Sequence, residues 1–187
     1  MQLDKIPEGS KLEIYVQQLT AVLKNDMDAF PQFMEKTFID CLNFVKKEQT
    51  ITFLPRISLK FARTHEEYLD MEQKVSKRAI EKEVAIAQSS AFTVGNRFDK
   101  RICVDVESFI NLLKHGCATF VFNLVETYIH EILHCAFHNR KSEQEIHSMQ
   151  CPIVETFLGI ELSNERKNLK ASDYYSKSNS TQVGVSS

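Results

Sequence analysis

The stretch CATFVFNLVETYIHEILHCAF, from Cys117 to Phe137, is the longest apolar run in the chain and constrains the fold most strongly. Five polar residues interrupt it, and they would be very costly at the centre of a bilayer: Asn123, Glu126, His130, Glu131 and His134. No membrane partner is therefore expected. We predict that this run forms a buried core helix from Ala118 to His138.

Two amphipathic helices are predicted at the start of the chain. Apolar residues recur at helical spacing from Ser10 to Lys24 and again from about Pro31 to Lys47. Alternating apolar and polar residues then predict a short strand near Ile57 to Phe61. The charge-rich segment from His65 to about Gln88 is typical of one or two solvated helices.

The stretch SSAFTVGNRFDKRICVDV predicts a hairpin, with strands near Ala91 to Val94 and Arg101 to Val106 joined by the turn GNRFDK. A helix is predicted from Glu107 to His115, and Gly116 marks its end or a bend. The stretch SEQEIHSMQCPIVETFLGIEL again has a helical pattern, in which Pro152 predicts an interruption.

The chain length and the predicted helices and strands together indicate one α+β domain, mainly helical, with a small sheet packed on the buried helix. The 187 residues are 43% hydrophobic and 26% charged, as in ordinary globular proteins. Within this domain we distinguish an N-terminal helical segment, residues 1–50, and a core, residues 51–165, that carries the candidate chemistry. Residues 166–187 are polar and are predicted to be a disordered tail.

Charge and cysteine content predict a cytoplasmic protein. The formal net charge of −2 gives no overall attraction to nucleic acid, so no nucleic-acid partner is expected. The residues MQLDKIPEGS lack the charged-then-apolar pattern of a secretory signal. Five cysteines without a C-x-x-C pair indicate free, mostly buried thiols instead of a disulfide framework.

The buried helix contains His130-Glu131-Ile132-Leu133-His134, the H-E-x-x-H pattern. Residues four apart lie on one face of a helix, so His130 and His134 can bind one Zn²⁺ ion while Glu131 stands beside the open coordination position. Glu131 is then the candidate catalytic general base for peptide-bond hydrolysis. The alternative is a core helix whose histidines pair with Glu126 or with backbone carbonyls, but the water-poor surroundings favour zinc.

A catalytic zinc ion needs a third protein ligand, and four downstream residues offer one: His138, Glu143, Glu145 and His147. His138 lies two turns from His130, too far along the axis for all three imidazoles to reach one ion. Glu145 has the spacing of a capping box with Ser142, which predicts a structural role.

Glu143 and His147 remain, four residues apart on one face of the following helix. We favour Glu143 as the ligand, with His147 donating a hydrogen bond to a ligand. The spacing leaves the reverse arrangement, with His147 as the direct ligand, open.

The motif HEILH followed by SEQEIH, with the pattern Glu143-x-x-x-His147, resembles the gluzincin metallopeptidases, and specifically the small single-domain minigluzincins. The resemblance covers about Ile57 to Leu162. It implies zinc bound by His130, His134 and Glu143, with Glu131 as the general base.

The same resemblance implies a peptide or protein substrate that adds a strand to a rim strand near Ala91 to Val94. It also implies that a small member can be latent, with the segment after Leu162 occupying the cleft.

Two other classes of protein compete with a peptidase. One is a catalytically silent, zinc-stabilised protein-interaction module, in which the N-terminal helices contact a partner. The other is an RNA-processing zinc hydrolase of the H-G-x-L-H kind. Glu131 in place of glycine and the lack of a basic excess argue against the second class.

Overall fold

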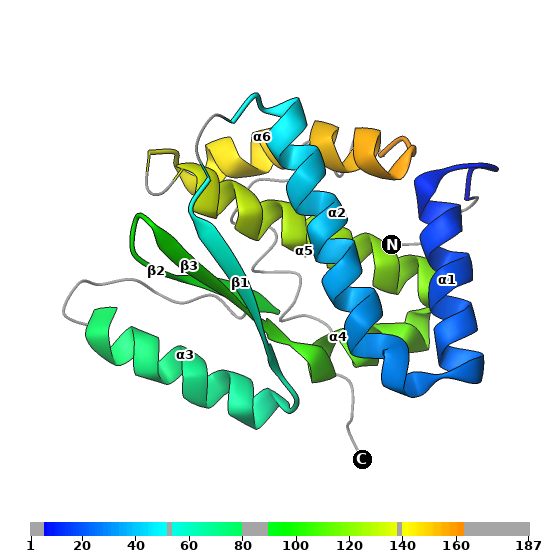
Figure 1. The fold of residues 1–187 in the computed structure, drawn as a ribbon, viewed down its shortest axis with the longest axis horizontal. Coiled ribbons are helices and arrows are strands. Elements are labelled where there is room, and N and C mark those ends of the chain that lie inside the picture. The colour runs from blue at the N-terminus through cyan, green and yellow to red at the C-terminus, as the bar shows by residue number, and fades with distance from the viewer. Residues whose placement is uncertain (1–5, 52–53, 80–89, 138–139, 163–187) are drawn as a thin grey trace, which may run out of the picture.

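The computed structural model describes residues 6–51, 54–79, 90–137 and 140–162. These residues form a mainly helical α+β domain around a three-stranded sheet (Figure 1). The elements in chain order are α1 (Lys11–Asn25), the 3₁₀ turn η1 (Met27–Ala29), α2 (Phe30–Glu48), β1 (Arg56–Ala62), α3 (His65–Ala79), β2 (Ala91–Gly95), β3 (Asp99–Asp105), α4 (Val106–Leu112), the 3₁₀ turn η2 (Leu113–His115), α5 (Cys117–Phe137) and α6 (Glu143–Leu158).

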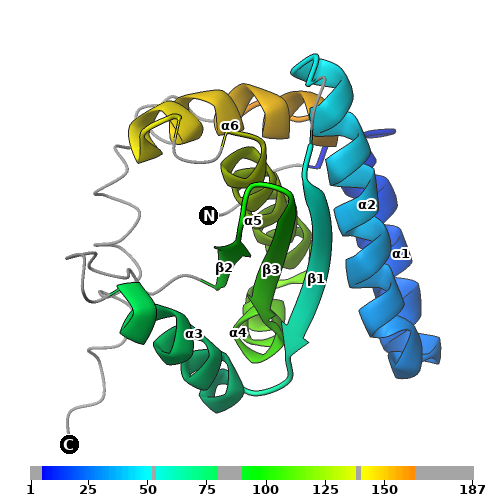
Figure 2. The same ribbon diagram turned by 60° about the vertical axis from the view of Figure 1, so that its left-hand side comes forward.

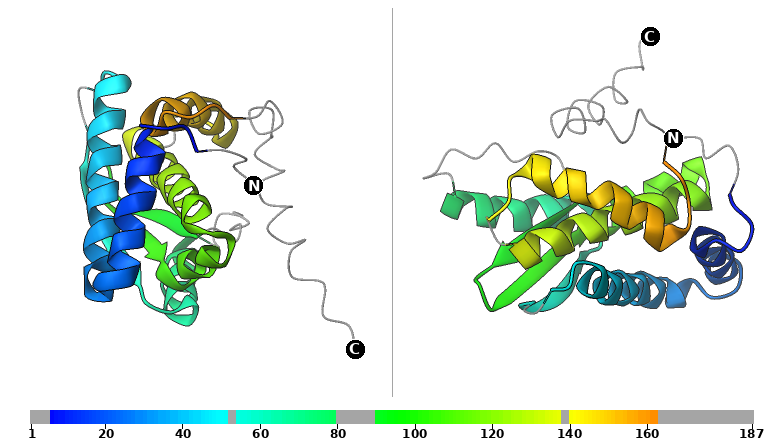
Figure 3. Two further views of the ribbon diagram at one scale, coloured as in Figure 1. Left: turned by 90° about the vertical axis from the view of Figure 1, so that its right-hand side faces the viewer. Right: turned by 90° about the horizontal axis from the view of Figure 1, so that it is seen from above.

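Helix α5 is the centre of the fold, as the apolar run predicts. Helices α1, α2 and α6 all contact it, and so does strand β2. Figures 2 and 3 show α1 and α2 side by side, and α6 lying along α5. The fully buried residues of α5 include Phe120, Leu124 and Tyr128. Each large apolar side chain buried in this way contributes about 1.5–3 kcal/mol to stability.

No helix in the described ranges is both long enough and apolar enough to cross a membrane, α5 included.

The sheet has the strand order β1-β3-β2, with β1 parallel and β2 antiparallel to β3. Its inner face packs on α5 through buried residues such as Ala91 and Ile102, while α3 lies on the outer face (Figure 2). The predicted hairpin and the predicted first strand are confirmed. Strands β1 and β2 form the two edges of the described sheet, and β3 lies between them.

A buried carboxylate joins the ends of β1 and β3 to the helices that follow them. Asp105 accepts hydrogen bonds from the backbone N–H of Ser108 at 3.1 Å and from its hydroxyl, and so caps α4. Nδ1 of His65, at the start of α3, lies 2.6 Å from the same carboxylate. His65 therefore has a structural role outside the candidate site.

The predicted helices at the N-terminus, around Glu107 and along the apolar run are all present. The prediction that Pro152 interrupts the last helix is wrong, because α6 continues through it to Leu158. Pro152 deprives the carbonyl of Ser148 of its helical donor, but Ser148 and Pro152 both lie on the exposed face, where water replaces that donor. Residues 80–89 and the predicted tail lie outside the described residues.

Gly95 is the last residue of β2, and its backbone has a conformation that only glycine adopts easily. A substitution at this position tests the structure of the hairpin. The φ of Gly95 is +134°, and a Cβ there would collide with the carbonyl oxygen of Asp99 and lie 3.0 Å from Cα of Lys100. We expect Gly95→Ala to lower the free energy of unfolding in urea by about 3 kcal/mol or more. Gly9→Ala is the control, because Gly9 also has a positive φ but no atom within 4 Å of the added Cβ, and it should cost about 1 kcal/mol. Equal losses would contradict the close approach of the two strands.

Candidate metal centre

Helix α5 places His130 and His134 one turn apart on the same face. Their ring centroids are 4.5 Å apart, and their Nε2 atoms face each other at 3.0 Å. His130 is the more enclosed ring, with 16% of its side chain exposed against 31% for His134. The two imidazoles of the H-E-x-x-H motif therefore converge on one point near the surface.

Helix α6 begins at Glu143, and this residue faces the point where the two imidazoles converge. Ser142 donates its backbone N–H to Oε2 of Glu145 at 2.8 Å, and its hydroxyl accepts the N–H of Glu145 at 3.3 Å. This reciprocal pair is the predicted capping box, and it gives Glu145 a structural role. Because the box fixes the first turn, Glu143 is held on a defined face of α6.

The carboxylate of Glu143 reaches across to α5. Its Oε1 lies 3.1 Å from Nε2 of His130, and its Oε2 lies 3.1 Å from Nε2 of His134. His147, one turn further along α6, places its Nε2 3.3 Å from Oε1 of Glu143. One carboxylate thus stands among three imidazoles from two helices.

The spacing of His130, His134 and Glu143 fits a zinc ion. The Nε2 atoms of His130 and His134 are 3.0 Å apart, and each lies 3.1 Å from a different oxygen of the Glu143 carboxylate. Tetrahedral zinc with bonds of about 2.0–2.1 Å holds its ligand atoms about 3.3–3.4 Å apart, so small side-chain adjustments would complete the coordination. The structure therefore brings the three predicted ligands together: His130, His134 and Glu143.

A second set also fits the size of a metal site. His130, Glu143 and His147 have ligand atoms that all lie within 4.8 Å of one another. His147 is the most enclosed of the histidines, with 8% of its side chain exposed. A catalytic metal keeps one position open to substrate, which favours the more exposed His134 as ligand and His147 as the group that orients Glu143.

Gln150 fixes the tautomer of His130, and the sequence reasoning missed it. Its Nε2 donates to the backbone carbonyl of Glu126 at 3.3 Å, so its Oε1 faces Nδ1 of His130 at 2.9 Å. An amide oxygen can only accept, so Nδ1 carries a hydrogen, and when the ring gives up the proton on Nε2 the lone pair is left on that atom. That is the tautomer a metal requires at Nε2. Spacing alone gave no sign of Gln150, which lies 20 residues from His130.

The charges of the cluster favour a cation. Burial lowers the pKa of His130, but its hydrogen bond with Glu143 and the charges of Glu131 and Glu143 outweigh burial and raise it. Burial raises the pKa of Glu143, but hydrogen bonds from three imidazoles hold that pKa well below its usual range. Both shifts show that positive charge is stabilised where these atoms meet, and a divalent cation would be attracted to the same point.

Glu131, the candidate base, lies on the same helix and is buried, with 6% of its surface exposed. Oγ1 of Thr93 on the edge strand β2 donates to Oε2 of Glu131 at 2.5 Å. Thr93 is the second residue that sequence reasoning missed. Its position on a predicted strand was visible, but the face of the strand on which it lies depends on the packing of the sheet against α5.

Cys135 is buried and free, which agrees with the prediction of free, mostly buried thiols. Burial raises its pKa to about 12, and its Sγ lies 3.8 Å from Oγ1 of Thr93. All five cysteines, which fall within the described ranges, are free. His138 lies outside the described residues.

No protein-family model, curated protein or solved structure matches this chain. The proposal below therefore rests on the residues of the site and their geometry.

The capping box of Ser142 and Glu145 is expected to stabilise the start of α6. Ser142→Ala removes the hydroxyl that accepts from Glu145, and we expect the free energy of unfolding in urea to fall by about 1 kcal/mol. Ser148→Ala is the control, because that exposed hydroxyl bonds only to the carbonyl of Gln144 within the helix, and its loss should cost less than about 0.5 kcal/mol. If both substitutions have the same effect, the box does not stabilise the helix start.

Proposed function

We propose that this protein is a zinc-dependent metallopeptidase in which His130, His134 and Glu143 hold the metal and Glu131 is the general base. The observation that carries the proposal is the meeting of two imidazole Nε2 atoms, 3.0 Å apart, with the two oxygens of the Glu143 carboxylate, each 3.1 Å from one of them, on two helices packed together. The resemblance to minigluzincins supports the same assignment, and the free cysteines fit a cytoplasmic location.

The chemistry follows from the placement of each side chain. Zinc held by His130, His134 and Glu143 would polarise a substrate carbonyl and acidify a water molecule. Glu131 would accept a proton from that water and pass it to the leaving amine. Thr93 holds the carboxylate of Glu131 by a hydrogen bond and so limits its orientation. Gln150 keeps Nε2 of His130 available to the metal.

The substrate we propose is an extended peptide or a protein segment bound along β2. This strand is paired with β3 on one side only, and in the described part of the sheet it forms an edge. Because Thr93 of β2 contacts Glu131, a peptide paired with that edge would lie beside the catalytic base. The segment proposed to confer latency, after Leu162, lies outside the described residues.

A second candidate function is a zinc-stabilised interaction module. The observation that favours it is the exposure of Ile14 on α1 and Ile39 on α2, each 47% exposed. Contiguous exposed apolar patches mark partner contacts, and in the module these two isoleucines would belong to such a patch. In this case the same metal centre would stabilise the fold without hydrolysing a substrate.

Glu131→Gln separates the two functions. The amide cannot accept the proton, so we expect hydrolysis of an unstructured peptide library to fall by about 10²- to 10⁴-fold. Zinc content, measured by atomic absorption, should remain at one ion per chain, because Glu131 is not a ligand. Unchanged hydrolysis would refute Glu131 as the base, and an unaltered protein with zinc but no hydrolysis would favour the interaction module.

Separate substitutions distinguish the two ligand sets. We expect His130→Ala, His134→Ala and Glu143→Ala each to abolish zinc binding measured against a chromogenic chelator. His147→Ala and Gln150→Leu should keep zinc with an affinity about 10- to 100-fold lower, because they orient ligands without touching the ion. If His147→Ala loses zinc while His134→Ala retains it, the ligand set is His130, Glu143 and His147 instead.

A further inference from the structure

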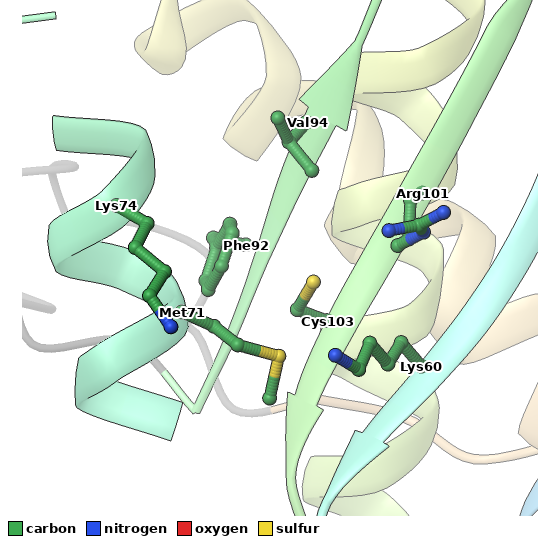
Figure 4. Close-up of a pocket in the computed structure, with 7 residues that line it drawn as sticks. All are labelled: Lys60, Met71, Lys74, Phe92, Val94, Arg101 and Cys103. Carbon is green, nitrogen blue, oxygen red and sulfur yellow. The ribbon is translucent and has the colours of Figure 1, made fainter. Parts of the chain in front are cut away.

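The outer face of the sheet contains a pocket of about 210 Å³, closed on one side by α3. Figure 4 shows the side chains that line it, drawn from all three strands and the helix. Its apolar part is formed by Met71 of α3, Phe92 and Val94 of β2, and Cys103 of β3. Thr93 lies between two of these residues but turns to the opposite face, toward Glu131. The pocket and the side chain of Glu131 therefore lie on opposite faces of β2.

The polar lining of the pocket is entirely cationic. It consists of Lys60 from β1, Lys74 from α3 and Arg101 from β3, without an acidic residue. In the view of Figure 4 the ammonium groups of Lys60 and Lys74 lie on opposite sides of Met71. Three like charges around one hollow repel each other, and an anion placed among them would relieve that repulsion.

These charges are only weakly compensated by the protein itself. Lys74 pairs with Asp70 at 2.5 Å, but both side chains are more than half exposed, and such pairs contribute little. Lys60 and Arg101 form no ion pair with any residue that the structure describes. Burial raises the pKa of the Cys103 thiol, while the charges of Arg101 and Lys60 act in the opposite direction. The charges of Arg101 and Lys60 therefore reach Cys103 in the apolar wall of the pocket.

We propose that this pocket binds a small amphipathic anion, whose carboxylate or phosphate group is attracted by the charges of Lys60, Lys74 and Arg101 and whose apolar body rests on Phe92, Val94 and Met71. Cationic hydrogen-bond donors suit both kinds of anionic group. The pocket is smaller than the roughly 300–1,000 Å³ typical of drug-sized ligands, which indicates a compact body such as a single ring or a short chain.

The test uses the unaltered full chain and four ligands in an NMR titration. Benzoate and phenyl phosphate carry both a ring and an anionic group, and their relative affinities distinguish a carboxylate site from a phosphate site. Benzamide has the shape of benzoate without its charge, and inorganic phosphate lacks the ring. We expect saturable shifts of the backbone amides of Phe92, Arg101 and Cys103 with at least one of the first two ligands, and no shift of His130.

A charge-removing variant and its matched control complete the experiment. Lys60→Gln combined with Arg101→Gln should weaken binding of the anionic ligand by about tenfold or more. Lys24→Gln combined with Lys46→Gln removes the same charge from exposed positions on α1 and α2, and it should leave the affinity unchanged. Equal weakening in both double variants would show nonspecific attraction and overturn the proposal.

Three other results would also overturn it. They are the absence of saturable shifts with both benzoate and phenyl phosphate, binding of benzamide as tight as that of benzoate, and binding of inorganic phosphate as tight as that of phenyl phosphate. Because these comparisons use only the unaltered chain, they decide the proposal even where a double variant does not fold.

Discussion

The contact between α5 and α6 brings one carboxylate into the midst of three imidazoles, and the rest of the site depends on this convergence. Removing polar groups from water costs free energy unless their hydrogen bonds and charges are satisfied. Glu143 is satisfied by His130, His134 and His147, all within 3.3 Å. The cluster stabilises added positive charge where its nitrogen and oxygen atoms meet, which supports the proposed cation site.

The fold holds this cluster on rigid elements. Helix α5 contacts α1, α2, α6 and β2, so the backbone that carries His130, Glu131 and His134 is fixed by the core. The start of α6 is fixed by its capping box, and Gln150 ties α6 back to the carbonyl of Glu126. A site built on packed helices keeps its geometry more closely than one built on loops. The two N-terminal helices therefore support the site without contributing a side chain to it.

Features encoded locally were predictable from the sequence. The apolar run gave α5, the spacing of Ser142 and Glu145 gave the start of α6, and alternation gave the hairpin of β2 and β3. The parallel pairing of β1 with β3 was not predictable, because it joins segments about 40 residues apart whose register depends on packing. The roles of Gln150 and Thr93, and the pocket formed by residues of four elements, also depend on tertiary contacts. Pro152 was misjudged because its effect depends on which face of α6 meets solvent.

X-ray absorption at the zinc edge of the zinc-loaded full-length protein tests the central claim most directly, since it reports the atoms around the metal. The account predicts one zinc ion per chain with only nitrogen and oxygen neighbours at about 2.0–2.1 Å, two of them from imidazoles. A sulfur neighbour at about 2.3 Å would place the metal on a cysteine and contradict the account. So would a protein that retains no zinc after dialysis against metal-free buffer.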